Sequence, residues 1–153
     1  MMAAMPPFRF LVPLIIGCAY FMQSLDATVI ATALPAIGRS LGEDPVRLNV
    51  AITSYLLSIA VFIPISGWLA DRFGGRTVLS AAIAIFTVAS VLCGLSNTVA
   101  ELVVARSLQG IGGAMMVPVG RLIILKTMAK ADLVTAMSYL TVPAVMGDRK
   151  STR

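Results

Sequence analysis

The chain has 153 residues, of which 58% are hydrophobic and 12% are charged, and its formal net charge is +5. A soluble domain carries about 25% charged residues, so this sequence has too little polar surface to enclose a water-soluble core. The basic residues lie in short segments between apolar runs, which is typical of a membrane protein and not of a nucleic-acid-binding one. The absence of histidine excludes histidine metal sites and histidine proton relays. We expect a protein of the lipid bilayer that binds no nucleic acid and no metal.

The first apolar run spans residues 10–34, and Asp26 is its only formally charged side chain. A helix of that length rises about 37 Å, which exceeds a hydrocarbon core of about 30 Å. A carboxylate at this depth costs on the order of a few kcal/mol without a partner, which marks Asp26 as a candidate functional residue. Arg9 and the Ala-Thr-Ala of residues 31–33 also resemble a cleavable signal peptide. However, the run is too long for a signal core, and Asp26 interrupts it.

Three further runs are long enough to span a membrane, namely residues 49–70, 78–95 and 98–125. Pro64 predicts a kink in the second span. A fifth run, 133–147, rises only about 22 Å and is too short to span without help. The connections are brief, so we expect neighbouring helices to be adjacent and antiparallel.

The positions of lysine and arginine predict the orientation of these spans. Arg39 and Arg47 would lie on the outer side of the membrane, and the N-terminus would be cytoplasmic. The cytoplasmic side would hold Arg9, Arg72, Arg76, Lys126 and Lys130, with Arg121 near it. The fifth run would then end outside, but the cationic segment DRKSTR of residues 148–153 follows it, and such a cluster is disfavoured there. We therefore expect an incomplete bundle with an aberrant charged tail, produced by truncation or by a shifted reading frame.

Asp26 and Arg106 each lie about eight residues, or about 12 Å, from the predicted outer end of their spans. Opposite charges at one depth offset each other's desolvation when their helices pack together. We predict that the two side chains face a common cavity and are paired directly or through water. The alternative is that each reaches the interface separately, or that the pair only staples the helices.

Gln109, Gly110 and Gly113 follow Arg106 at helical spacing and share its face. Glycines at such spacing predict close helix packing. Gln109 is open to two interpretations, a hydrogen bond across helices or a contact with a ligand.

The segment GWLADRFGGR, residues 67–76, joins the second and third spans. Gly67 would permit a close helix crossing, and Gly74 and Gly75 would permit a sharp turn over residues 71–77. An ordinary solvated loop, in which the arginines only set the topology, is the alternative interpretation.

Asp71 lies near the end of the second span, where the helix macrodipole disfavours an anion. We therefore expect a compensating partner for this carboxylate. The candidates are Arg72, Arg76 and the positive N-terminus of another helix.

Three segments of the chain together resemble the signatures of a known family. The matching residues between the second and third spans are Gly67, Leu69, Ala70, Asp71, Arg72, Gly74, Arg76 and Leu79, and those in the fourth span are Leu102, Arg106, Gln109, Gly110, Gly112 and Ala114. With LDATVIATALP at residues 25–35, they resemble the major facilitator superfamily, in its drug:proton antiporter group with a fourteen-helix plan. The resemblance covers about residues 10–147.

The resemblance implies an all-α membrane fold of two six-helix bundles. The chain, residues 1–153, would hold four transmembrane helices and a partial fifth from the N-terminal bundle. It would then be the N-terminal part of a multidrug exporter of a bacterial plasma (inner) membrane and not an enzyme. The implied partners are a small lipophilic substrate, protons, the lipid bilayer and the missing C-terminal helices of the same transporter.

The same resemblance implies roles for the candidate residues. The proton gradient would supply the energy, without any cofactor, and would drive alternating access. Proton or substrate coupling would fall to Asp26, Arg106 and Gln109. A cytoplasmic gate would be formed by Gly67, Asp71, Arg72, Gly74 and Arg76.

The chain also departs from the family pattern. Position 75 is glycine where the family often has arginine, and position 31 is alanine where asparagine is frequent. The fifth run begins like the antiporter signature but turns charged after Gly147. The alternative function is therefore a truncated membrane protein that does not transport and acts as an interaction partner or persists as a relic.

Overall fold

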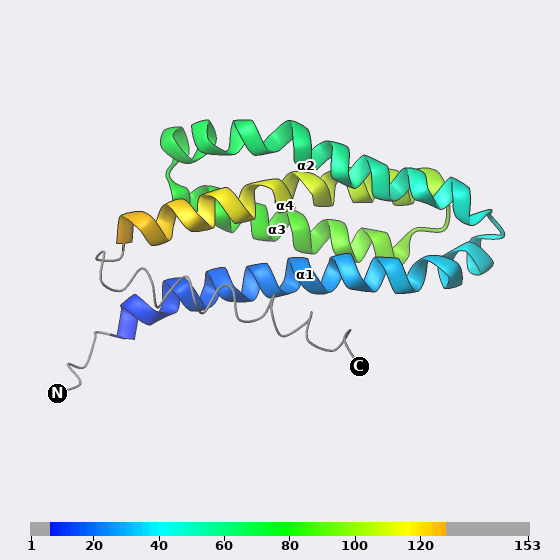
Figure 1. The fold of residues 1–153 in the computed structure, drawn as a ribbon, viewed down its shortest axis with the longest axis horizontal. Helices are drawn as coiled ribbons and strands as arrows, with labels where there is room; N and C mark the ends of the chain where they lie inside the picture. Colours follow the sequence, from blue (N-terminus) through cyan, green and yellow to red (C-terminus); the bar gives the residue numbers. More distant parts are fainter. Residues whose placement is uncertain (1–6, 128–153) are drawn as a thin grey trace, which may run out of the picture.

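The computed structural model describes residues 7–127, which form four helices (Figure 1). These are α1 (Pro7–Leu41), α2 (Pro45–Phe73), α3 (Gly75–Leu95) and α4 (Val99–Thr127). Each is long and apolar enough to cross a membrane, which confirms the expected all-α class and the four predicted spans. The fifth apolar run and the charged tail lie outside the described residues.

The first helix is longer than its predicted span, because it continues through Pro35 to Leu41. It ends at Gly42, whose φ of 65° is the left-handed conformation that glycine adopts readily. The Glu43 N–H then donates to the Gly38 carbonyl at 3.0 Å, which closes the helix end. The glycine and not the proline therefore sets this boundary.

The turn between α2 and α3 is a single residue, Gly74, with φ at 86°. Its N–H donates to the Ala70 carbonyl at 3.0 Å. The turn predicted over residues 71–77 is therefore shorter than expected, because both helices continue into it. Gly75 is the first residue of α3, and a Cβ added there would lie 3.0 Å from Ile123 Cγ1 of α4. Gly74 thus provides the turn, and Gly75 provides the close packing.

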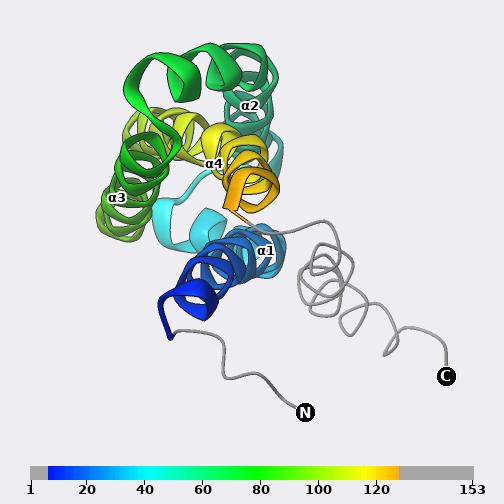
Figure 2. The same ribbon diagram turned by 90° about the vertical axis from the view of Figure 1, so that its left-hand side faces the viewer.

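Helix α4 lies at the centre of the bundle (Figure 2). It packs against α2 and α3 and, less extensively, against α1. In its most apolar window 61% of the residues are buried, against 11% in the corresponding windows of α1 and α2. The helix that carries Arg106 and Gln109 is thus the most enclosed, because in a membrane the apolar side chains can face lipid while small residues mediate helix contacts.

Two apolar clusters fill the bundle along α4. One cluster, which includes Phe86, Met116 and Ile124, lies toward the C-terminal end of α4. The other contains Leu48, Ala51 and Leu102 and lies toward its N-terminal end. The stretch of α4 that carries Arg106 and Gln109 falls between them in the sequence, so the polar site has a hydrophobic cluster on either side.

Candidate functional site

Asp26 of α1 and Arg106 of α4 form an ion pair inside the bundle. Arg106 Nη1 lies 2.8 Å from Asp26 Oδ2, and the exposed fractions of the two side chains are 6% and 13%. The direct pairing predicted from their depth is therefore observed. The guanidinium offsets the desolvation of the carboxylate in surroundings where a lone charge would be costly.

Gln109 completes the coordination of the same carboxylate. Its Nε2 donates to Asp26 Oδ1 at 2.8 Å, so both oxygens of Asp26 accept hydrogen bonds from α4. The Gln109 side chain is fully buried, and its Oε1 accepts a hydrogen bond from Cys93 Sγ of α3 at 3.6 Å. Of the two interpretations left open for Gln109, the structure shows the hydrogen bond across helices.

Helix α2 contributes an aromatic ring to this site. The Arg106 guanidinium carbon lies 5.9 Å from the centre of the Tyr55 ring, within the range of a cation–π contact. Tyr55 and Cys93 were not predicted as site residues, since a tyrosine and a cysteine within apolar runs carry no signal that separates them from packing residues. The polar site therefore draws one side chain from each of α1, α2 and α3 onto α4.

Glycines on α4 bring the neighbouring helices close enough for these contacts. A Cβ added at Gly110 would lie 2.6 Å from the Tyr55 carbonyl oxygen, so the backbone of α2 approaches at this point as predicted. A Cβ at Gly112 would lie 2.8 Å from the Ala82 carbonyl oxygen of α3. Gly113 faces side chains instead, with Gln23 Nε2 at 3.3 Å from the position of its Cβ.

Asp71, at the end of α2, has a different partner from those predicted. Its Oδ1 lies 3.7 Å from Lys126 Nζ of α4, and both side chains are largely exposed. Arg72, Arg76 and a helix N-terminus were the expected partners, and that prediction is wrong. The reason is topological, because the α2–α3 turn and the C-terminal end of α4 lie at the same end of the bundle (Figure 1).

The other predicted gate residues lie on the surface of the described bundle. Arg72 stacks on the Trp68 ring, with its guanidinium carbon 5.5 Å from the ring centre, and Arg76 is exposed in the first turn of α3. A Cβ added at Gly67 would meet nothing within 4 Å. The close crossing predicted at Gly67 is therefore absent within residues 7–127.

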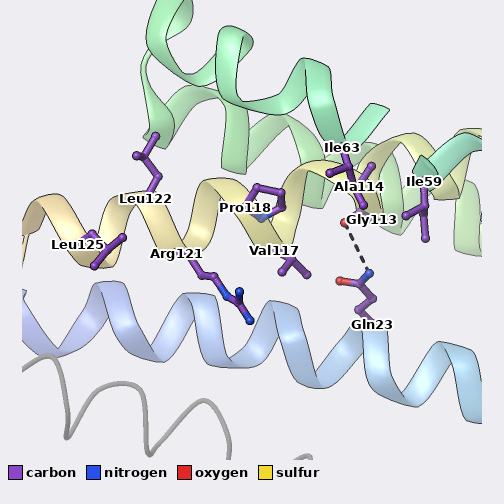
Figure 3. Close-up of a pocket in the computed structure, with 10 residues that line it drawn as sticks. All are labelled: Gln23, Ile59, Ile63, Gly113, Ala114, Val117, Pro118, Arg121, Leu122 and Leu125. Carbon is purple, nitrogen blue, oxygen red and sulfur yellow. Dashed lines mark hydrogen bonds between the residues drawn. The ribbon is translucent and has the colours of Figure 1, made fainter. Parts of the chain in front are cut away.

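A cavity of about 490 Å³ lies between α1, α2 and α4 (Figure 3). Its lining residues are Gln23, Ile59, Ile63, Gly113, Ala114, Val117, Pro118, Arg121, Leu122 and Leu125. Neither Asp26 nor Arg106 is among them, so the predicted cavity shared by the ion pair does not coincide with this one. The two features are nevertheless neighbours, because Gln23 precedes Asp26 by one helical turn and Gly113 follows Gln109 by one turn.

Comparison with known proteins places these features in a family context. The profile of the Major Facilitator Superfamily matches residues 16–147. The chain is 50% identical over 133 residues to the "Putative multidrug resistance protein MdtD" of Salmonella paratyphi B and of Salmonella typhimurium strain LT2. It is 49% identical to the protein of that name from Salmonella dublin. Each alignment covers 87% of this chain but 28% of the relative.

Proposed function

The chain belongs to the major facilitator superfamily, and from that premise we propose that it forms part of a proton-coupled exporter of small lipophilic compounds. The observation that carries the proposal is the Asp26 carboxylate, enclosed in a membrane-spanning helix and held by Arg106 and Gln109. Such an intramembrane carboxylate is a candidate proton carrier. The relatives named for multidrug resistance support the substrate class, although the chain spans 28% of their length.

Coupling in this proposal rests on the change of charge at Asp26. A proton that binds the carboxylate neutralises it, so the attraction that holds Arg106 at Asp26 is lost. The contact joins α1 to α4, and its loss changes the relative stability of two arrangements of these helices. Alternating access follows when substrate and proton each favour a different arrangement.

The gate in this proposal lies at the end of the bundle that holds the α2–α3 turn. Gly67 leaves open space on α2, and Arg76 is exposed, which suits contacts with helices beyond the described residues. The exposed Asp71–Lys126 pair is weak enough to exchange partners during transport. We assign this end to the cytoplasm of a bacterium and place the protein in the inner membrane, in keeping with the positive-inside rule.

Replacement of Asp26 by asparagine tests the proposed function. In a full-length version of the transporter, Asp26→Asn keeps the size of the side chain but cannot exchange a proton near neutral pH, so proton-driven export should be abolished or strongly reduced while membrane insertion is retained. The measurement is dye efflux from proteoliposomes with an imposed proton gradient. Glu43→Gln is the matched control, because Glu43 pairs with Arg47 at the surface, and export should persist. Normal export by Asp26→Asn would remove Asp26 from the mechanism.

A further inference from the structure

Among the described residues, a single charged side chain lines the cavity between α1, α2 and α4. Arg121 carries that charge, Gln23 is the one polar amide, and every other lining residue is apolar or glycine (Figure 3). Among residues 7–127, no carboxylate lines the cavity. The nearby Asp26 is already paired with Arg106. The wall therefore combines a broad apolar surface with a net positive charge.

Arg121 extends from α4 toward α1 in Figure 3. Within residues 7–127 the ion pairs are Arg47–Glu43, Arg106–Asp26 and Lys126–Asp71, so none of the described carboxylates compensates Arg121. Arg121 is exposed in the described bundle, and a cation beside an apolar surface attracts an anion. The positive charge of Arg121 also disfavours the entry of a cationic compound into the cavity.

Gln23 adds an unsatisfied polar atom at the other end of the cavity. Its Oε1 is buried and accepts no hydrogen bond within the described part of the chain, while its Nε2 donates to the Gly113 carbonyl at a long 3.5 Å. Figure 3 shows the amide oxygen on the side of the group that faces Arg121. A buried acceptor without a partner is costly, so this position favours a ligand that brings an O–H or N–H donor.

Apolar side chains line the cavity between Gln23 and Arg121. Gly113, which contacts Gln23, precedes Arg121 by eight residues on α4, a rise of about 12 Å. Ile59 and Ile63 of α2 face α4 across this wall (Figure 3). Because the Arg121 side chain tilts toward the N-terminus of α4, a chain of no more than about ten carbon atoms spans the two polar ends.

We propose that this cavity binds an anionic amphiphile, with its acidic group at Arg121, its apolar body along α2 and α4, and a hydrogen-bond donor at Gln23. For a transported ligand, the inference rests on the proposed export function. It narrows the substrate class from lipophilic compounds to lipophilic acids. An acidic phospholipid shares the same chemistry, so the experiment separates the two sources.

Equilibrium binding to the protein in nanodiscs of phosphatidylcholine tests the proposal, with ω-hydroxydecanoate as the probe and calorimetry as the readout. The probe should bind, whereas a decyl chain that carries trimethylammonium and a hydroxyl at its ends should not. Arg121→Gln should weaken the affinity for the acid at least about tenfold, because the ion pair is lost. Arg39→Gln is the matched control, since Arg39 is an exposed arginine near the opposite end of α1.

A second variant, at Gln23, tests the hydrogen bond from the ligand's donor and leaves the charge of Arg121 unchanged. Wild-type protein should bind ω-hydroxydecanoate more tightly than decanoate, and Gln23→Leu should remove this preference while still binding decanoate. If Gln23→Leu kept the preference, or if Arg121→Gln bound the acid as tightly as wild type, the proposal would be wrong. Equal binding of the trimethylammonium compound would also overturn it.

Phosphatidylglycerol added to the nanodiscs separates the two sources of the anion. Competition with ω-hydroxydecanoate would identify the lipid as the occupant, and unchanged affinity would identify a diffusible acid. Binding is measured without a proton gradient, so a protein that fails to export can still bind the probe. Conversely, an active exporter that ignores the probe would contradict only the substrate class.

Discussion

Asp26 illustrates how a membrane protein keeps a charge at depth. Both carboxylate oxygens accept hydrogen bonds from α4, one from Arg106 and one from Gln109. Tyr55 lies against the Arg106 guanidinium, and Cys93 holds the far end of the Gln109 amide. Both hydrogen bonds to this carboxylate come from α4, so its surroundings depend on how α1 packs against α4, which is the property that a coupling residue needs.

Removal of Arg106 should destabilise the bundle through the carboxylate that is left behind. Arg106→Ala leaves Asp26 buried with Gln109 alone, and we expect a loss of about 3 kcal/mol in the free energy of unfolding. Denaturation of the purified protein in detergent micelles measures this loss. In an Asp26→Asn background the same substitution should cost much less, because no buried charge then lacks its partner. Equal losses in the two backgrounds would show that the residues do not interact energetically.

At the scale of the helix, α4 combines polar side chains with small residues. Gly110 and Gly112 lie against the backbones of α2 and α3, respectively, so the axes approach closely enough for short side chains to meet across them. Gly75 serves the same purpose at the start of α3, against Ile123. The glycines therefore position the ion pair even though they do not touch it.

A methyl group at Gly110 should push α2 away from α4. The added Cβ would lie 2.6 Å from the Tyr55 carbonyl oxygen, and because that atom is backbone, a helix has to move. We expect Gly110→Ala to lower the free energy of unfolding by about 2 kcal/mol, as measured by denaturation in micelles. Gly94→Ala on α3 is the control, since its Cβ would meet nothing within 4 Å. A Gly110 variant as stable as the control would refute close packing at this position.

At the scale of the whole molecule, the four helices sort their basic residues between two ends. Arg72, Arg76 and Lys126 lie at the end that holds the α2–α3 turn, whereas Arg39 and Arg47 lie at the end that joins α1 to α2 (Figure 1). This distribution agrees with the sidedness predicted from the sequence. The assignment of the first end to the cytoplasm follows from the positive-inside rule.

Single cysteines at the two ends test this orientation. In a background with Cys18 and Cys93 replaced by serine, a membrane-impermeant maleimide added to intact cells should label Ser40→Cys. It should label Arg76→Cys only after the membrane is permeabilised, because the proposed orientation places that position in the cytoplasm. The measurement is a Western blot of the protein, in which labelling by a mass-tagged maleimide is detected. The reverse pattern would invert the proposed topology and the location of the gate.

Hydropathy and charge along the sequence were sufficient to predict the membrane helices and the buried ion pair. A long apolar run has few alternatives to a membrane helix, since backbone groups in lipid must be satisfied within the segment. Two opposite charges at equal depth predicted the Asp26–Arg106 pair, because an unpaired charge there is too costly. Each of these inferences uses only the position of a residue along its own helix.

Only the tertiary structure decided which faces of the helices meet. It replaced the expected partners of Asp71 by Lys126 and brought Tyr55 and Cys93 into the polar site. It also placed a cavity beside Gln23 and Arg121, one helical turn from the ion pair. The rotation and separation of helices depend on how small residues from different segments pack together, and a pattern within one segment does not contain that information.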